Sequence, residues 1–463
     1  MKCTKKIVGA VVRSGIIILL ALAPLFSHAQ KMTFVKADSL TYALYLSGQW
    51  DSLIVVGNQA LDDGFDYFYL RERIAMAYFN KDKFRLAASQ FEKAVGFNSS
   101  DTFALRHLYL CYLYSGRDAD AWMLTGKFNT DLRASLGIEK NVFVNGLYAE
   151  GGYIFSNSLK KYAGADFDDL ANLYGEVDLT GSYSYVHLGL KHPITKFLNI
   201  YHAYSNLSIE KEKIMQHRDT SRKEDFYMLQ QNQYYIQATI NLNRKWLIVP
   251  AFHYLNVRYS PLYASFDTIS GYVYTQEHQK LNDFAAFLGI SKDFGYTSLG
   301  ISGSLSQLNS KTYIQANATL NIFPLGNLNL YSLTTLSGVL ERDSAGTKDA
   351  GQPGKGKPRI IFSETIGGKI FRKLYAEAGL TYGDISGYNE KNAFVVNNIP
   401  DHTKYRAGMS LIYNLSPHID LGVYYLYTEK EGSYFFYNTI NSVVYKNYNY
   451  QINTITGGVK WKL

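Results

Sequence analysis

The residues that could do chemistry are scattered through the second half of the chain. His202 and Ser205, or His187 and Asp178, could form the hydrogen-bonded pair that activates a nucleophile. However, the sequence has no nucleophile elbow, no HExxH motif and no spaced cysteine and histidine cluster. We therefore predict no catalytic residues, no metal site, no cofactor and no enzymatic activity.

Two carboxylates stand two residues apart, at Glu176 and Asp178. On an extended strand this spacing places both on one face, where general acid and base catalysis is one use for such a pair. The more ordinary arrangement pairs them with basic groups across a sheet. Lys369 and Arg406 are candidate partners, together with Glu377 as a further acid in such a ladder.

The overall charge excludes a nucleic-acid-binding protein. The chain has 463 residues and a formal charge of +8, but the first 29 residues contribute four basic residues and no acid. The remainder has 43 basic against 39 acidic side chains. It contains no run rich in lysine and arginine of the kind that binds a phosphate backbone. With 47% hydrophobic residues and nine prolines, the chain is expected to fold, into about two or three domains.

Residues 1–29 read as a cleaved signal peptide. A cationic start precedes an apolar stretch at 16–23, and Ser27-His28-Ala29 matches the small-x-small rule for cleavage. The alternative is an uncleaved anchor, although the apolar stretch is short for a membrane span of about 20 residues. Cys111 is then the one cysteine of the mature chain, so no intramolecular disulfide is expected.

Residues 31–135 are predicted to form a helical repeat. Apolar and aromatic residues recur at helical spacing, and a step of 34 residues maps one block onto the next without insertion. Small residues let the helices approach closely while aromatic residues fill the gaps between helix pairs. The residues assigned to this packing are Gly48, Trp50, Ala60, Ala75, Tyr78, Phe84, Ala87, Phe91, Ala94, Tyr112, Gly116 and Ala121.

Residues 142–463 change to a period of two, which predicts an antiparallel β-barrel. Near 175–185, 234–242 and 312–322, apolar residues alternate with polar ones. We expect the apolar face to contact lipid and the polar face to line the lumen. The predicted lumen-facing residues are Glu176, Asp178, Gln237, Thr239, Asn241, Gln315, Asn317 and Thr319.

About fourteen strands can be counted, and their connectors alternate between short and long. Short turns are expected near 243–245, 293–295, 372–373 and 416–417, and long loops at 157–172, 211–226, 261–280, 342–358, 384–402 and 431–448. Outer-membrane barrels have short periplasmic turns and long external loops, and an even strand count leaves both ends of the barrel on the short-turn side. Both termini and the helical repeat are therefore predicted to be periplasmic.

The predicted fold is thus an α + β multidomain chain. A signal peptide, a short tetratricopeptide-like block and a C-terminal transmembrane barrel, closed by a strand that alternates up to Trp461 and Leu463, together resemble the YaiO-type outer-membrane barrels. More loosely, the order is similar to that of exopolysaccharide exporters that join periplasmic repeats to a barrel. The resemblance implies the outer membrane of a Gram-negative bacterium as the location.

Two functions remain open on the sequence. The barrel is expected to be a pore or export conduit for a hydrophilic solute or polysaccharide, since its predicted lumen carries neutral hydrogen-bonding groups. A lumen of this size could be open, gated or blocked by a folded-in loop. The alternative is a non-transport protein that tethers a periplasmic protein partner to the outer membrane. In both cases the expected partners are outer-membrane lipid and a periplasmic protein bound by the helical repeat, and nucleic acid is expected in neither.

Overall fold

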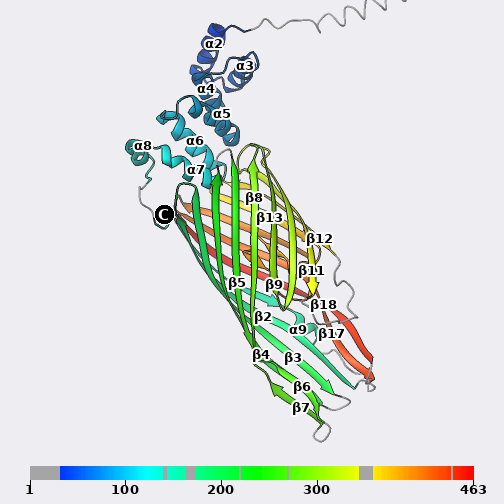
Figure 1. Cartoon of the computed structure of the whole chain (residues 1–463). Helices are drawn as coiled ribbons and strands as arrows, with labels where there is room; N and C mark the ends of the chain where they lie inside the picture. The colour runs from blue at the N-terminus through cyan, green and yellow to red at the C-terminus, as the bar shows by residue number, and fades with distance from the viewer. Residues whose placement is uncertain are drawn as a thin grey trace, which may run out of the picture.

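The computed structural model describes residues 32–138, 143–162, 173–217, 221–242, 245–267, 271–343, 358–439 and 442–462 (Figure 1). The predicted signal peptide, most of the loop 157–172 and the core of the loop 342–358 lie outside these ranges. The described chain consists of a block of helices followed by a β-barrel. No helix in the described ranges is long and apolar enough to cross a membrane.

The helices form antiparallel pairs that repeat along the chain. Helices α2, α4 and α6 begin at residues 34, 68 and 102, and α3, α5 and α7 at 50, 84 and 118, a step of 34 in each series. Their bounds are α2 Phe34–Leu46, α3 Trp50–Asp62, α4 Phe68–Asn80, α5 Phe84–Phe97, α6 Thr102–Tyr114 and α7 Asp118–Leu124, with η2 Thr125–Lys127 and α8 Thr130–Ser135 beyond them. We call residues 34–135 the helical block.

The turn inside each helix pair uses the left-handed backbone region at the same repeat position. Gly48, Asp82 and Gly116 have φ values of 66°, 56° and 73°. Glycine adopts this region without strain, whereas a residue with a Cβ rarely does. The predicted packing residues follow the same periodicity: Ala60, Ala75, Ala87, Phe91, Ala94, Tyr112 and Ala121 are buried, while Tyr78 and Phe84 pack against the core and Trp50 contacts Tyr45.

Fourteen antiparallel strands close into a barrel, which confirms the predicted fold class and strand count. Around the wall their order is β1-β18-β17-β16-β13-β12-β11-β10-β9-β8-β5-β4-β3-β2. Their bounds are β1 Gly146–Ser156, β2 Tyr174–Pro193, β3 Leu198–His217, β4 Ser221–Leu242, β5 Trp246–Tyr259, β8 Gln279–Asp293, β9 Thr297–Leu308, β10 Lys311–Ile322, β11 Leu330–Asp343, β12 Arg359–Phe371, β13 Leu374–Tyr382, β16 His402–Ser416, β17 Ile419–Thr439 and β18 Ser442–Lys462.

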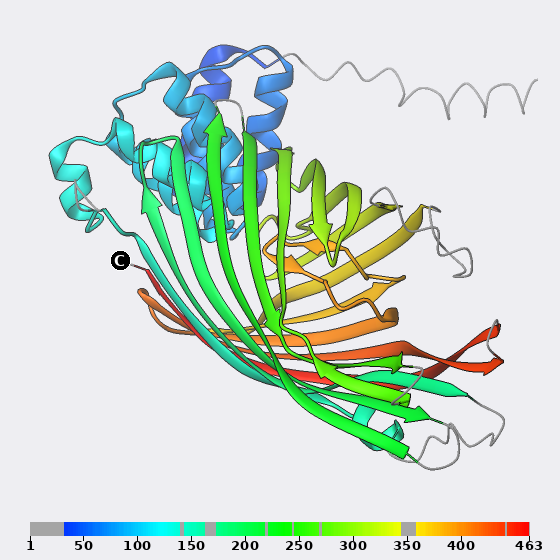
Figure 2. The ribbon, with the colours of Figure 1, turned by 60° about the horizontal axis from the view of Figure 1, so that its bottom comes forward.

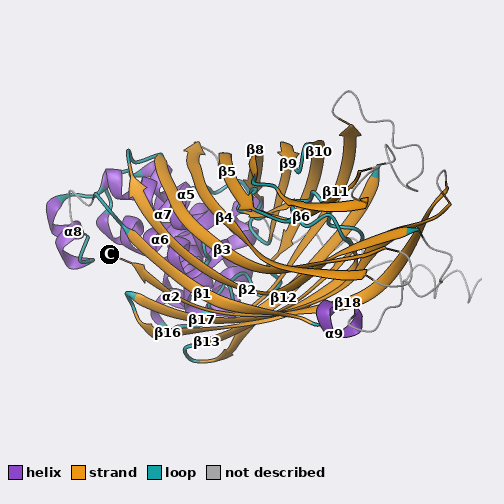
Figure 3. Cartoon of the chain, turned by 90° about the horizontal axis from the view of Figure 1, so that it is seen from below, coloured by secondary structure: helices purple, strands orange, loops and turns teal. Residues whose placement is uncertain are grey.

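Two of the predicted long loops are strands. Residues 211–217 and 221–226 continue β3 and β4, and 431–439 and 442–448 continue β17 and β18, with paired registers throughout. For 211–226 the prediction was wrong because this segment is rich in charged and polar residues, which weakens the apolar alternation used to find strands. In 431–448 the alternation is lost for another reason, because aromatic residues follow one another directly at 434–437. These extensions project beyond the barrel at the end opposite the helical block, together with α9 Ser158–Tyr162 and the hairpin of β6 Leu262–Asp267 and β7 Gly271–Gln276 (Figures 1 and 3).

The outer face of the barrel is an apolar band between two aromatic zones. Side chains in mid-strand, including Leu288, Ile301 and Ile366, are more than half exposed. Aqueous proteins rarely expose such a continuous surface, whereas lipid solvates it. On β5, ten residues separate Trp246 near the helical end from Asn256, a span of roughly 25 Å for a strand tilted by about 40°. This height matches the hydrocarbon core that an outer-membrane barrel crosses.

The helical block stands on one side of the barrel rim (Figure 2). Arg85 at the start of α5 is buried there, where it forms an ion pair with Asp293, donates to the Gly295 carbonyl at 2.5 Å and lies 3.8 Å from the centre of the Phe323 ring. Its backbone N–H donates to the Gly326 carbonyl. Helix α5 is therefore bound to the turns that join β8 to β9 and β10 to β11.

A second set of contacts lies on the next turns around the rim. Trp122 donates from its ring nitrogen to the Thr195 carbonyl in the β2–β3 turn, at 3.0 Å. Lys245, between β4 and β5, forms a 3.0 Å ion pair with Glu92 of α5. Because Thr195 and Lys245 lie next to paired strands, these contacts give the helical block a defined position on the barrel.

Candidate functional site

A segment that connects two strands of the wall folds into the lumen. Residues 383–401 leave β13 and return to β16, and they contain the short strands β14 Asn389–Glu390 and β15 Val395–Val396 (Figure 2). We call this segment the strap. The sequence prediction placed a long loop here and left open whether a loop fills the lumen; the structure places this loop inside.

The tip of the strap reaches the opposite wall. The Tyr235 hydroxyl donates to the Asn392 carbonyl at 3.0 Å, and His253 Nδ1 donates to the Ala393 carbonyl at 2.8 Å. The Phe394 ring packs edge-on against Tyr235 and His187, with ring centres 5.1 and 5.0 Å apart. Since β4 and β5 lie across the barrel from β13 and β16, the strap spans the full bore.

The middle of the strap is held by two adjacent strands. The Gln315 side chain on β10 donates to the Asn389 carbonyl at 2.8 Å and accepts from its N–H at 2.9 Å, which mimics a strand pairing. The Asn389 amide also donates to Ser304 and Ser306 of β9. Small hydroxyls and an amide thus bind the strap where larger side chains would exclude it.

Ion pairs fix the first foot and the middle of the strap. Arg359 of β12 pairs with Asp384 at 2.5 Å and donates to the Ser386 carbonyl at 2.7 Å. Arg406 of β16 pairs with Glu390. Buried pairs of this kind are costly to break on one side only, because the remaining charge loses its partner. The first foot and the middle of the strap are therefore anchored more firmly than the tip.

The tip adopts a strained backbone. Lys391, Asn392 and Ala393 have φ values of 48°, 61° and 62°, three consecutive left-handed residues that each carry a Cβ. Each such residue costs about 1–2 kcal/mol, with asparagine the most tolerant. Contacts with the wall therefore hold a conformation that the segment alone disfavours, and backbone strain of this kind is concentrated at functional sites.

Between the strap and the helical end, the inner faces of β4 and β10 carry neutral polar side chains, whereas Glu377 on β13 accepts there from Tyr331 and Ser410. Gln237 accepts from the Asn392 amide at 3.2 Å and donates to Thr239 at the same distance, while Asn317 donates to Ser302 at 2.9 Å. Thr319 lies on the same face of β10 as Gln315 and Asn317. The structure thus places these five predicted lumen residues together on the inner wall.

Asn241 has a different environment from the other predicted lumen residues. It is buried at the rim, where its amide donates to Asp120 of α7 at 2.9 Å. Asp120 also accepts from Arg117 at 2.7 Å. This end of the lumen wall is therefore part of the interface with the helical block.

Glu176 and Asp178 lie far from the strap, in the projecting part of β2. Glu176 pairs with Lys213 at 3.2 Å and Asp178 with Lys211 at 3.5 Å, both on the neighbouring strand β3. The prediction that Lys369 or Arg406 pairs with these carboxylates is wrong. Each carboxylate pairs with a lysine on the adjacent strand, because that side chain is closer than any on the opposite wall.

The inward and outward faces of β2 are interchanged partway along the strand. A register shift between Thr180 and Tyr183 inserts one residue opposite β3, so the apolar side of 175–185 does not stay on one face. Tyr183 and Tyr185 pack inside against Ile154 and Tyr450. Period-two reasoning misses such a bulge because it assumes an unbroken pleat.

The histidine and serine candidates pair differently from either expectation. His187 is buried between Ser205, at 2.9 Å from Nδ1, and the Tyr201 hydroxyl, at 2.8 Å from Nε2. His202 instead contacts His192 at 2.9 Å. Both ring nitrogens of His187 are thus satisfied by hydroxyls, an arrangement that fixes the wall beneath Phe394. Within the described ranges, no group of three or more His, Cys, Asp or Glu side chains is placed to hold a metal ion.

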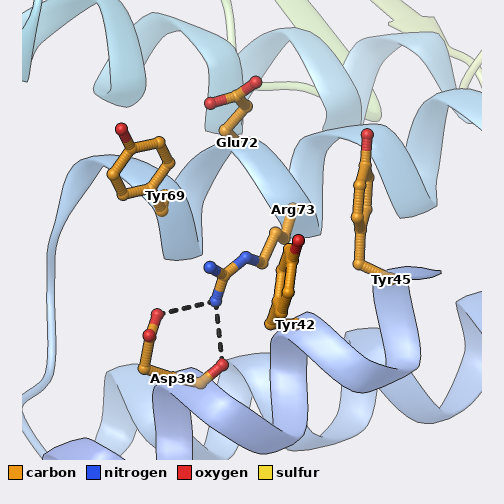
Figure 4. A pocket seen from close by; sticks show the side chains of 6 residues that line it. All are labelled: Asp38, Tyr42, Tyr45, Tyr69, Glu72 and Arg73. Carbon is orange, nitrogen blue, oxygen red and sulfur yellow. Dashed lines mark hydrogen bonds and ion pairs between the residues drawn. The ribbon is translucent and has the colours of Figure 1, made fainter.

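A groove of about 360 Å³ lies on the helical block between α2 and α4 (Figure 4). The Arg73 guanidinium crosses it, donating to the Asp38 side chain at 2.7 Å and stacking 5.0 Å from the Tyr42 ring centre. Tyr45, Tyr69 and Glu72 complete the lining. Aromatic faces beside fixed charges suit a peptide or a polar polymer.

No family model matches this sequence, and no curated protein matches it. Solved structures with similar coordinates include the toluene transporter TodX of P. putida, with 9% identity over 69% of this chain and 90% of that chain and a TM-score of 0.43. A Pseudomonas aeruginosa FadL homologue has 9% identity over 70% and 91% of the two chains and a TM-score of 0.45. A bacterial polysaccharide outer membrane secretin has 8% identity over 70% and 100%, with a TM-score of 0.34.

Proposed function

We propose that this protein is a gated conduit in the outer membrane of a Gram-negative bacterium, for a hydrophilic solute or polysaccharide. The strap is the gate, and the helical block lies in the periplasm as a tetratricopeptide-like module that binds a periplasmic protein partner. The observation that carries the proposal is the strap itself, which crosses the bore, is held by ion pairs at Asp384 and Glu390, and has a strained tip.

The lining supports passage of polar cargo. On the helical side of the strap, Gln237, Thr239, Asn317 and Thr319 offer amides and hydroxyls without a fixed charge. Such groups exchange hydrogen bonds with water or with sugar hydroxyls at little cost.

The alternative is a tether that does not transport. It is favoured by the same crossing of the bore, because a permanently fixed strap leaves a closed barrel. In that case the groove around Arg73 would be the functional site, and the barrel an anchor for whatever binds there.

The two readings differ in single-channel conductance. We expect purified wild-type protein in planar bilayers to show rare or small steps, and a variant with residues 387–398 replaced by a short glycine-serine linker to show large, long-lived steps. The replacement removes the middle and tip contacts, including Glu390, the partner of Arg406, and keeps the ion pair of Arg359 with Asp384. We expect this loss of contacts to open the bore.

The matched control replaces 263–274, a segment of equal length in the β6–β7 hairpin that projects beyond the barrel. Its conductance should equal that of the wild type. If the strap variant shows no conductance steps although heat-modifiable migration confirms a folded barrel, the gated conduit is excluded and the tether is the remaining function.

A further inference from the structure

On the outer face of the wall, four neighbouring strands carry an unusual row of asparagines. The register places Asn206 of β3 opposite Asn232 of β4, Asn232 opposite Asn256 of β5, and Asn256 opposite Asn282 of β8. These strands lie side by side in Figure 1. A lipid-facing surface normally carries few amides, because their polar groups are costly in hydrocarbon.

A row of aromatic residues lies directly on the membrane side of the asparagines. Tyr204, Tyr234 and Tyr254 face one another across β3, β4 and β5, with exposures of 50%, 44% and 40%. Aromatic residues with a hydroxyl mark the depth at which hydrocarbon gives way to headgroups. The asparagine row therefore lies at headgroup level.

The hydrogen bonds of this row repeat. Asn232 Oδ1 accepts from the Tyr204 hydroxyl at 2.6 Å and from the Asn206 amide at 3.0 Å. Two strands further on, Asn282 Oδ1 accepts from the Tyr254 hydroxyl and from the Asn256 amide, both at 2.8 Å.

Because both bonds use the oxygen, each of these amides keeps its nitrogen as a donor. Among the described residues, Asn232 Nδ2 and Asn282 Nδ2 have no hydrogen-bond acceptor. Two oriented donors thus stand at the same height, two strands apart.

A basic pair lies one step further from the membrane. Arg258 and Lys280 are directly opposite each other on β5 and β8, and both are exposed. Arg258 donates from Nε to Asn256 at 2.9 Å, which orients its guanidinium over the asparagine row. Two cations side by side with no acid between them suit a phosphate.

We infer that this face binds a phosphorylated glycolipid. The parts of such a molecule match the surface in order of depth. The acyl chains would contact the apolar band, the sugar hydroxyls and amides would bind the tyrosine and asparagine rows, and a phosphate would bind Arg258 and Lys280. The inference rests on the proposed orientation, in which the projecting end of the barrel faces outward, since glycolipid is then on that side.

The test is binding of lipid A bearing two phosphates to the full mature protein in phospholipid nanodiscs, followed by native mass spectrometry or fluorescence titration. Phosphatidylglycerol supplies an anionic lipid without sugar, and dephosphorylated lipid A supplies the sugar without phosphate. We expect bisphosphorylated lipid A to bind most tightly. This readout needs no conductance, so it can fail or succeed independently of the proposed gate.

Two double variants test the basic pair and the asparagine row separately. Arg258→Gln with Lys280→Gln removes the cations, and Asn232→Leu with Asn282→Leu removes the amide donors. Each is expected to weaken lipid A binding by about tenfold or more, because each removes two polar contacts with the headgroup. The charge variant changes exposed side chains only, so it remains informative if the asparagine variant fails to fold.

The chain offers a matched control in Asn453→Leu. Asn453 on β18 also accepts from a tyrosine hydroxyl, that of Tyr425 at 2.7 Å, but Glu429 stands on the outward side of this pair instead of a basic residue. Its variant should bind lipid A as the wild type does. Equal binding of phosphatidylglycerol and lipid A, or equal loss of binding in this control, would overturn the inference.

Discussion

His107 in α6 is a half-buried histidine surrounded by aromatic rings. Its Nδ1 donates to the Phe103 carbonyl at 2.8 Å, and the Phe91 and Phe79 rings lie 5.7 and 5.2 Å away. Burial lowers the pKa of His107 below its usual 6.5, and the nearby Arg106 lowers it further. The folded chain therefore binds this proton less readily than the unfolded chain does.

A lowered histidine pKa makes stability depend on pH with a definite sign. Below pH 6.5 the unfolded chain takes up the proton first, so the helical block should lose stability as the pH falls from 7 towards 5. His107→Phe keeps an aromatic ring and removes the titration. We expect its thermal unfolding, followed by circular dichroism at 222 nm, to lose this part of the acid slope. Identical slopes for the two proteins would contradict the assignment.

At the scale of elements, α5 docks on the barrel through one buried arginine. Arg85 and Asp293 have side-chain exposures of 3% and 12%. Removing one member of a buried pair leaves an uncompensated charge and typically costs about 3–5 kcal/mol. We expect Arg85→Ala to lower the melting temperature of the helices markedly.

Lys81→Ala is the control for this variant. Lys81 pairs with Asp51 on the surface of the same block, where Asp51 is 82% exposed. Exposed pairs contribute about 1 kcal/mol or less, so this change should leave the melting temperature nearly unchanged. Equal shifts for the two variants would mean that the docking contact does not stabilise the block.

Elements were predictable from the sequence where their pattern is local. The step of 34 residues and the fourteen strands follow from periodicities within one segment. The strap was not predictable in the same way, because Asn389 and Asn392 read as ordinary loop residues until Gln315 and Tyr235 are known to face them. Likewise, the amide donors of Asn232 and Asn282, unpaired among the described residues, can be recognised only once the strand register shows which side chains lie opposite them.

At the scale of the molecule, the two ends of the barrel differ. The first and last strands, β1 and β18, pair with each other and place Gly146 opposite Lys462 at the helical end. The β6–β7 hairpin lies at the other end (Figure 1). We predict that an epitope tag inserted after Asp267 is accessible to antibody on intact cells.

A tag placed after Leu463 should become accessible only when the outer membrane is permeabilised. Labelling of the C-terminal tag on intact cells, with the hairpin tag protected, would reverse the orientation and move the helical block outside.

The docking of α5 has a mechanical consequence. The turns that Arg85 contacts are the near ends of β9 and β10, and the far parts of the same two strands hold Asn389 through Ser304, Ser306 and Gln315. A hydrogen-bonded strand pair behaves as a stiff rod that transmits displacement with little stretching. A load on the helices, such as tension from a bound partner, would therefore pull on the middle of the strap through two rods about one membrane thickness long.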